Sequence, residues 1–305
     1  MIKHFNSVFD FTPEQLSSLM VLTREMKKYP ARFGDAFKGR TLAMIFQKPS
    51  LRTRFTFQTG IFQMGGQGIY LGPNDIKIGQ REATKDIAAN LSRWADIIMF
   101  RTFGHANVVE LAEYSMVPVI NALSDMYHPC QAIADIFTLY ERRKNLDRLK
   151  LAYVGDGNNV LHSLINISAS FGMDISYATP KGYEPKEEVV SVAQELALQT
   201  GSKIKGTFDP IEAVKGADAV YTDVWASMGQ EDEAEARKKI FHPYQVNSEL
   251  MTYTQSGAWF LHCLPAHRGD EVTDEVADAR YSLILDQAEN RMHAQKALMY
   301  MLAKQ

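Results

Sequence analysis

The sequence predicts an α/β protein with two doubly wound parallel-sheet domains and a cleft between them. Short β-branched and apolar runs alternate with amphipathic stretches along the chain, as expected for strands that alternate with helices. These runs form two successive series, and a length of 305 residues is more typical of two domains than of one. Polar clusters begin directly after several predicted strands, where open parallel sheets bind their ligands.

The individual elements follow from local signals. A first helix is indicated by Thr12 as N-cap, Pro13 at the first helical position and Gln15 three residues after the cap. The charged stretch 135–150 is expected to form the helix that connects the domains, and residues 288–303 the last helix. The strands that we expect are residues 41–46, 68–71, 96–100, 117–120, 149–154, 174–178, 217–222 and 258–261, with a weaker pattern at 281–285.

Composition and charge are those of an ordinary folded protein. The hydrophobic content is 46%, the charged content 23% and the formal net charge -3, which argues against a disordered chain and against a nucleic-acid partner. No stretch approaches the roughly 20 apolar residues of a membrane span, so we expect a cytoplasmic protein that binds no membrane. Cys130 and Cys263 lie outside any CxxC pair, which argues against a disulfide or redox motif.

The segment Ser50-Leu51-Arg52-Thr53-Arg54 lies between a predicted strand and a predicted helix. A helix N-terminus offers unpaired N–H groups, and Arg52 adds a planar guanidinium that suits phosphate oxygens. With the hydroxyls of Ser50 and Thr53, these groups would form an anion-binding site. The alternative is a capped helix start with surface arginines. The glycines of a Walker loop are absent.

The turn Gly155-Asp156-Gly157-Asn158-Asn159 is similar to a dinucleotide-binding turn, but it lacks two of that motif's features. Val160 stands where the third glycine would be, and no acid follows the next strand at Thr179. We therefore expect no nicotinamide or other cofactor. The glycines need only form a tight turn, which would direct the two asparagine amides into the cleft.

Histidines and cysteines suggest polar chemistry more than metal binding. His128 and Gln131 stand in the first turn of a predicted helix, where they could polarise a carbonyl and hold a small amide, although His128 alone could be a structural hydrogen-bonding group. No tight ligand pair is followed by a second, so we expect no metal site. The candidates for such a site were His128, Cys130, His262, Cys263 and His267.

The segment from Asp223 to Gly229 combines an acid, the hydroxyl of Ser227 and a flexible glycine. An acid and a hydroxyl beside a cleft suit a cationic, amino-acid-like ligand, whereas the alternative is a solvated loop. Cys263 follows an apolar strand and is either a small buried hydrophobic residue or a thiol that faces the ligand.

Taken together and in this order, these clusters resemble the ornithine carbamoyltransferase family of the aspartate/ornithine carbamoyltransferase superfamily. The resemblance implies an enzyme that joins carbamoyl phosphate to the side-chain amine of L-ornithine, giving L-citrulline and phosphate in arginine biosynthesis or its catabolic reverse. The segments that carry it are Ser50-Leu51-Arg52-Thr53-Arg54, His128-Pro129-Cys130-Gln131, Asp223 through Ser227-Met228-Gly229, His262-Cys263-Leu264-Pro265 and Ala288-Glu289-Asn290-Arg291.

The resemblance also implies an assembly and two domains. Residues 1–142, with 286–305 packing back on them, would bind carbamoyl phosphate, and residues 143–285 would bind ornithine. Family members are homotrimers or multiples of trimers, with an active site between subunits and the loop around Lys77 supplied by a neighbour.

Site residues follow from the matching motifs. Arg101, His128, Asp223 and Cys263 would be catalytic, with Asp223 orienting the amine and Cys263 contacting it. The ornithine-binding residues would be Asn159, Asp223, Ser227 and Met228. The residues that would bind carbamoyl phosphate are Ser50, Leu51, Arg52, Thr53, Lys77, Arg101, His128, Gln131, Cys263, Leu264 and Arg291.

Two positions depart from the family pattern. Leu51 stands where many members have Thr, and a backbone N–H can serve there, whereas Lys77 stands where many have Gln or His and adds a positive charge.

A carbamoyltransferase for putrescine, an acylated ornithine or aspartate is the nearest alternative, but aspartate enzymes resemble a His-Pro-Leu-Pro pattern in place of His-Cys-Leu-Pro. A catalytically silent paralogue would be expected to lose charged site residues that this chain retains.

Overall fold

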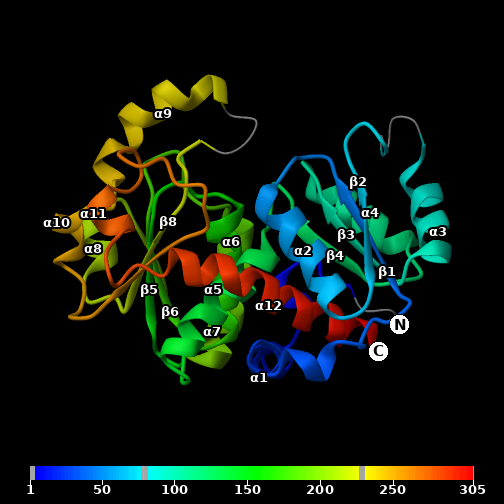
Figure 1. Cartoon of the computed structure of the whole chain (residues 1–305). Coiled ribbons are helices and arrows are strands. Elements are labelled where there is room, and N and C mark those ends of the chain that lie inside the picture. The colour runs from blue at the N-terminus through cyan, green and yellow to red at the C-terminus, as the bar shows by residue number, and fades with distance from the viewer. Residues whose placement is uncertain (1–3, 77, 79–81, 227–230, 305) are drawn as a thin grey trace. The chain divides into compact units, whose positions relative to one another are not determined.

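The computed structural model describes residues 4–76, 78, 82–226 and 231–304. They divide into two compact units, a first unit of Met1–Phe137 with Glu289–Gln305 and a second unit of Thr138–Ala288 (Figure 1). The boundary falls inside helix α5 (Pro129–Arg142), whereas the boundary predicted from the sequence follows residue 142. Each unit contains one parallel sheet, which confirms the predicted fold class. No helix among the described residues is long and apolar enough to span a membrane.

The first unit has a four-stranded sheet in the order β2-β1-β3-β4. Its two central strands are buried along almost their whole length, and their apolar side chains contribute to the core. The strands are β1 (Thr41–Phe46), β2 (Gln67–Leu71), β3 (Ile97–Arg101) and β4 (Val119–Leu123). The helices are α1 (Pro13–Lys28), α2 (Leu51–Gln63), α3 (Thr84–Trp94), α4 (His105–Tyr114), the first part of α5 and the end of α12 (Ile284–Ala303), with short 3-10 turns at Val8–Asp10 and Pro30–Phe33.

The first helix begins as its capping residues predict. The Thr12 side chain accepts from the Gln15 N–H at 3.3 Å, and the Gln15 side chain accepts from the Thr12 N–H at 3.0 Å. Pro13 occupies the first turn, where its missing N–H leaves no hydrogen bond unmade.

The second unit has a five-stranded sheet in the order β7-β6-β5-β8-β9. Its strands are β5 (Lys150–Val154), β6 (Asp174–Ala178), β7 (Ile204–Thr207), β8 (Ala219–Thr222) and β9 (Trp259–His262). Its helices are the remainder of α5, α6 (Asn159–Ser170), α7 (Glu187–Thr200), α8 (Pro210–Val214), α9 (Ala234–Phe241), α10 (Ser248–Met251), α11 (Asp274–Ala277) and the start of α12, with 3-10 turns at Glu231–Glu233 and His242–Tyr244.

Each sheet reverses its direction of growth at one point, between β1 and β3 in the first unit and between β5 and β8 in the second. At such a switch point the loops after the two strands diverge to opposite faces and leave a ligand-binding crevice. Ser50 comes shortly after β1 and Arg101 ends β3, while Asp156 comes shortly after β5 and Asp223 directly after β8. The polar clusters therefore lie at the positions that the topology favours for ligands.

Three details of the predicted elements were wrong. Residues 281–285 form no strand, because Ser282 makes only an isolated bridge with Phe260 before α12 begins at Ile284. The expected connecting helix over 135–150 lies earlier, since α5 ends at Arg142 and Lys150 already opens β5. Strand β7 was not predicted because its sequence, Ile-Lys-Gly-Thr, is short and has one strongly apolar residue, which is enough for an edge strand.

Gly157 allows the turn after β5 to pack against the chain at residues 183–185. A Cβ at this position would lie 2.4 Å from main-chain atoms of Tyr183, Glu184 and Pro185. We expect Gly157→Ala to lower the free energy of unfolding by about 1–3 kcal/mol, the usual range for overpacking at a tight site. Thermal and urea unfolding would measure the change.

Gly34→Ala is the matched control, because the nearest atom to a Cβ there is the Ala31 carbonyl oxygen at 3.7 Å. Equal melting temperatures for the two variants would contradict the prediction, because the backbone near residue 157 could then shift to accommodate a Cβ at little cost.

Candidate active site

The first unit holds the predicted anion-binding motif at the start of α2. Ser50 is the N-cap, and its Oγ accepts from the Thr53 N–H at 3.2 Å. Leu51 occupies the first helical position and is 76% exposed, so its contribution to a ligand can come from its backbone N–H group. The first turn of α2 therefore presents N–H groups at the carboxyl end of β1.

A buried chain of hydrogen bonds joins this motif to α5 and α12. Arg291 donates to the Thr53 hydroxyl at 3.1 Å and to Gln131 Oε1 at 2.5 Å. Gln131 in turn donates through Nε2 to Asp135 Oδ1 at 2.7 Å. Thr53, Gln131, Asp135 and Arg291 are all nearly inaccessible to solvent, so the orientation of each polar group is fixed by its neighbours.

His128 lies in the same unit among positive charges. Burial lowers its pKa well below the ordinary histidine value, and the charges of Arg291, Arg101 and Arg52 lower the pKa further. The imidazole is therefore neutral at physiological pH, while three guanidinium groups act on it electrostatically. Such a concentration of positive charge around a neutral hydrogen-bonding ring suits a multiply charged anion.

Cys130, the neighbour of Pro129 in α5, is not one of the residues that could act on a substrate in this unit. Its thiol is buried and donates to the Asn121 carbonyl at 3.3 Å. Burial raises the pKa of Cys130 to about 12, so the thiol stays protonated and unreactive. Its contacts are those of a structural residue.

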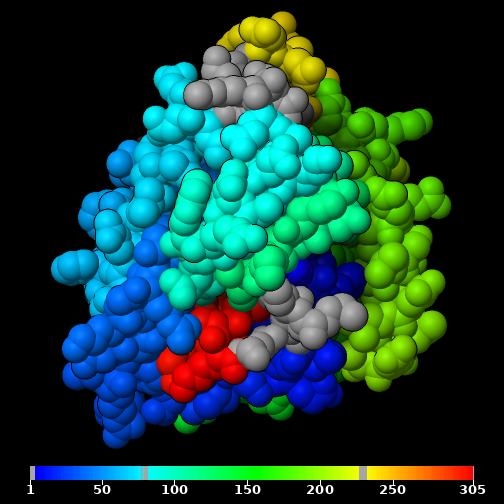
Figure 2. Space-filling model, turned by 90° about the vertical axis from the view of Figure 1, so that its right-hand side faces the viewer, coloured from blue at the N-terminus to red at the C-terminus, as the bar shows by residue number. Residues whose placement is uncertain are grey.

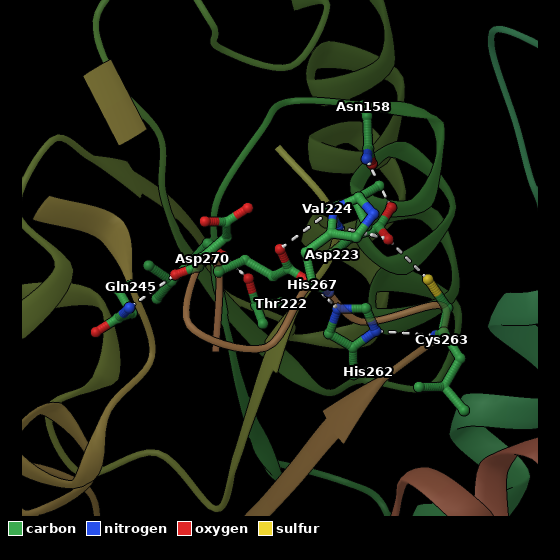
Figure 3. A network of polar contacts seen from close by, with 12 residues as sticks. Asn158, Thr222, Asp223, Val224, Gln245, His262, Cys263, His267 and Asp270 are labelled. Atoms are coloured by element: carbon green, nitrogen blue, oxygen red, sulfur yellow. Dashed lines mark hydrogen bonds and ion pairs between the residues drawn. The ribbon is translucent and has the colours of Figure 1, made fainter. Parts of the chain in front are cut away.

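In the second unit, polar side chains converge on Asp223, which directly follows β8 (Figure 3). The thiol of Cys263 donates to Asp223 Oδ1 at 2.9 Å, and Asn158 Nδ2 donates to Asp223 Oδ2 at 2.8 Å. The Val224 N–H also donates to Oδ1 at 2.8 Å. Strands β5, β8 and β9 thus each deliver one member of the cluster through the residues that follow them.

His262 supports this cluster without entering it. The Leu264 N–H donates to Nδ1 at 2.9 Å, so Nδ1 carries no proton. The proton is therefore on Nε2, which donates to the buried Glu271 Oε1 at 3.1 Å. His262 is consequently neutral and fixes the start of the segment that bears Cys263 and Leu264.

Asp223, His262 and Cys263 each offer a potential metal-ligand atom, and these atoms lie within 4.8 Å of one another. Both ring nitrogens of His262 are engaged in hydrogen bonds, so a cation there would have to displace one of them. The thiol is likewise hydrogen-bonded to the carboxylate that a cation would need. The arrangement fits a hydrogen-bonded support better than a coordination site.

A second acid, Asp156, follows β5 in the same unit. Burial raises its pKa to about 6; the ion pair with Arg237 opposes that shift and the negative charge of Asp223 adds to it. The buried Tyr153 hydroxyl lies near the same acids, and its pKa is raised well above the ordinary value by burial and then by Asp223, Asp156, Cys263 and Glu271. Arg237 balances the charge of Asp156, so Asp223 is the carboxylate that contributes net negative charge at this end of the second sheet.

The candidate residues fall into two groups, each within its own unit. Ser50, Thr53, Gln131 and Arg291 are joined by hydrogen bonds in the first unit, with Arg52, Arg101 and His128 near them electrostatically. Asp223, Cys263 and Leu264 belong to the second. Asn159 begins α6, and its neighbour Asn158 is the amide that reaches Asp223. Lys77, Ser227 and Met228 lie outside the described residues.

Sequence reasoning missed three residues of these networks. Asp135 stands four positions after Gln131 in one helix, a spacing that places both on one face and that could have identified it. Asn158 was expected only to point into the cleft, and Arg237 was not among the predicted site residues. No local signal marks Arg237, because its partner Asp156 lies far away in the sequence.

Comparison with known proteins gives a consistent result for both halves of the chain. Residues 3–141 match the family model described as aspartate/ornithine carbamoyltransferase, carbamoyl-P binding domain, and residues 147–302 match the Asp/Orn binding domain of the same family. An ornithine carbamoyltransferase of Thermococcus kodakarensis is 52% identical over 95% of this chain and 93% of that protein. An anabolic ornithine carbamoyltransferase of Pyrococcus furiosus is 48% identical, over 95% and 93% of the two chains.

Solved structures agree. The ornithine carbamoyltransferase from Pyrococcus furiosus superposes with a TM-score of 0.95 at 46% identity, covering 97% of this chain and 96% of that one. The anabolic ornithine carbamoyltransferase from Campylobacter jejuni superposes with a TM-score of 0.94 at 38% identity, covering 99% of each chain. Both the sequence and the fold are thus similar along nearly the full length.

Proposed function

The chain belongs to the aspartate/ornithine carbamoyltransferase family, and we propose that it transfers the carbamoyl group of carbamoyl phosphate to the side-chain amine of L-ornithine, releasing L-citrulline and phosphate. The observation that carries this proposal is the opposite charge of the two clusters. The unit that matches the carbamoyl-P binding domain gathers Arg52, Arg101 and Arg291. The unit that matches the Asp/Orn binding domain presents Asp223 beside Asp156, whose charge is balanced by Arg237. A phosphate ester suits the first cluster and a cationic amine suits the second.

In this proposal the first unit binds the donor. The first turn of α2 and the Arg52 guanidinium hold the phosphate oxygens, and Arg101 and Arg291 balance their charge. His128 and Gln131 bind the carbamoyl group. When the amine attacks, the carbonyl oxygen gains negative charge, which fixed donors such as Arg101 and His128 stabilise without needing to rearrange.

The second unit binds the acceptor. An alkyl ammonium group has a pKa near ~10, so ornithine arrives protonated, and the Asp223 carboxylate attracts and orients it. The Cys263 thiol hydrogen-bonds to Asp223, so an amine held by Asp223 would lie within reach of the thiol. The nitrogen loses one proton before it attacks and a second as the new C–N bond forms, while the C–O bond to phosphate breaks. Asp223, Cys263 and the departing phosphate are the candidate proton acceptors.

A substrate panel tests the proposed activity. With carbamoyl phosphate as donor, we expect kcat/KM to be highest with L-ornithine among L-ornithine, putrescine, N-acetylornithine and L-aspartate. The reason is that Asp223 repels the added carboxylate of aspartate, while putrescine lacks the α-amino and carboxylate groups. Colorimetric detection of each ureido product would measure the rates. A higher kcat/KM for any other amine would contradict the proposed substrate.

The role of Arg52 is tested by a matched pair of variants in one helix. We expect Arg52→Ala to lower kcat/KM by roughly 100-fold or more, because a charged hydrogen-bonding group at the phosphate is lost. Arg54→Ala is the control, since the Arg54 guanidinium lies 3.9 Å from the centre of the Tyr70 ring and has no proposed contact with substrate. Circular dichroism would check that both variants fold. Equal activities would refute the role of Arg52.

We also infer that the protein is a homotrimer or a multiple of trimers, with Lys77 supplied by a neighbouring subunit. The family supports this, and so does an exposed apolar face on helix α2 of the first unit. Figure 2 shows one side of the chain, with residues of the first unit in cyan and blue-green toward the viewer. Leu51, Phe55 and Phe62 are 76%, 68% and 76% exposed, and their spacing places them on one side of α2. β2 beside them is an edge strand with exposed residues. An apolar face beside an open edge is typical of an interface.

Light scattering is expected to give a mass of three chains or a multiple of three. The double variant Phe55→Asp/Phe62→Asp should lower that mass, because charges would be buried in an apolar contact. Leu198→Asp is the control, since Leu198 is 88% exposed but lies in the second unit. A monomeric or dimeric wild type would contradict the assembly, and an unchanged mass in the double variant would contradict the interface.

A further inference from the structure

Arg237 in α9 is an arginine that is almost wholly buried, with a side-chain exposure of 8%. Its guanidinium donates to the Trp225 carbonyl oxygen at 2.9 Å and to Glu233 at 3.0 Å. It pairs with Asp156 at 3.3 Å and lies 4.9 Å from the centre of the Tyr183 ring. Arginine is rarely buried unless its charge and donors are satisfied, and here Nε pairs with Glu233 while Nη1 contacts both the Trp225 carbonyl and Asp156.

Two of these contacts, with the Trp225 carbonyl and with Asp156, connect Arg237 to the segments that hold Asp223. Trp225 stands two residues after Asp223, so the bond to its carbonyl oxygen holds the backbone on that side. On the other side, Asp156 belongs to the turn after β5, where the Asn158 N–H donates to the Asp156 carbonyl at 2.8 Å. Asn158 then donates to Asp223 through its side chain. The Asp223 carboxylate is thus restrained from both directions by contacts that converge on Arg237.

Besides holding these segments in place, Arg237 balances one of the two negative charges in the cluster. Asp156 and Asp223 interact as like charges, and burial disfavours ionisation of Asp156. The ion pair with Arg237 acts in the opposite sense and offsets the charge of Asp156. Among the described residues, no ion pair joins Asp223 to a cation. The net result is one compensated carboxylate beside one that can attract an incoming ammonium group.

We propose that Arg237 is a positioning residue for the acceptor amine, which fixes Asp223 through Trp225 and through the Asp156 turn and neutralises Asp156, so that Asp223 alone presents a negative charge to the substrate. The inference rests on the proposed function, in which Asp223 binds ornithine. Arg237 does not touch the substrate in this account. Its effect is confined to the acceptor, because its contacts with the described residues lie in the second unit.

Steady-state kinetics of the full-length Arg237→Met variant tests this proposal. Methionine has a comparable length but no charge and no donors. We expect the KM for ornithine to rise roughly 10-fold to 100-fold, the range for losing hydrogen bonds to charged groups, while the KM for carbamoyl phosphate stays within about twofold. Equal increases in both constants, or no increase in either, would overturn the proposal.

Two further variants separate positioning from general stability. The double variant Arg237→Met/Asp156→Asn removes both charges, so no buried carboxylate is left without its partner and the melting temperature should recover. Its KM for ornithine should nevertheless remain high, because the bond to the Trp225 carbonyl is still absent. Recovery of both the melting temperature and the KM would show that the pair is merely structural.

Arg237→Lys retains the charge but cannot reach both Asp156 and the Trp225 carbonyl as a planar guanidinium does. Its KM for ornithine should lie between those of wild type and Arg237→Met, and a KM equal to that of Arg237→Met would exclude the charge-compensating part of the proposal. This variant also keeps the test decisive if the methionine variant fails to fold.

Arg268→Met is the matched control. Arg268 also lies in the second unit and pairs with two carboxylates, Asp274 and Asp278, each at 2.7 Å, but these residues are exposed, and no ion pair among the described residues joins them to Asp223 or Asp156. Its kinetic constants should equal those of wild type. The wild-type substrate panel tests the proposed function separately: if another amine proves to be the substrate, the same comparison of variants made with that amine still decides on Arg237.

Discussion

Parallel strands direct their carboxyl ends to one edge of a sheet, and in both units the polar residues are placed by that constraint. Ser50 and Arg101 reach the first cluster because they follow or end the two strands at the switch point of the first sheet. Asp156 and Asp223 occupy the equivalent positions in the second. Neither cluster requires a long loop to bring distant residues together, since the sheet itself performs that task.

Placing so many polar groups at buried strand ends creates a cost that the surrounding hydrogen bonds must offset. Arg291 is satisfied by Thr53 and Gln131, and Gln131 by Asp135. In the second unit a neutral histidine takes the equivalent role, because His262 accepts from one backbone group and donates to Glu271. These buried residues are hydrogen-bonded to, or next in sequence to, the residues that would contact substrate. Their fixed geometry limits how far the contacting residues can move.

The sequence predicted the strand ends well and the supporting contacts poorly, and the reason is physical. Ser50, Arg101 and Asp223 stand next to apolar runs, so their position at a sheet edge follows from local pattern. Arg237 sits in a charged helix whose periodicity suggests a solvated face, and only the fold brings it to Asp156. The strand β7 was missed for a related reason, because an edge strand needs fewer apolar residues than a central one.

Charge also explains how one chain can direct two small polar substrates to different binding sites. The first cluster is positive, and burial beside three arginines keeps His128 neutral, so the imidazole can hydrogen-bond a carbonyl without adding a fourth charge. The second cluster is negative, with Asp156 compensated by Arg237 and Asp223 available to a cation. A cationic amine is repelled by the first cluster, and a phosphate ester by the second. In the proposed function, each unit would therefore select its substrate partly by repelling the other one, which attractive contacts alone would not achieve.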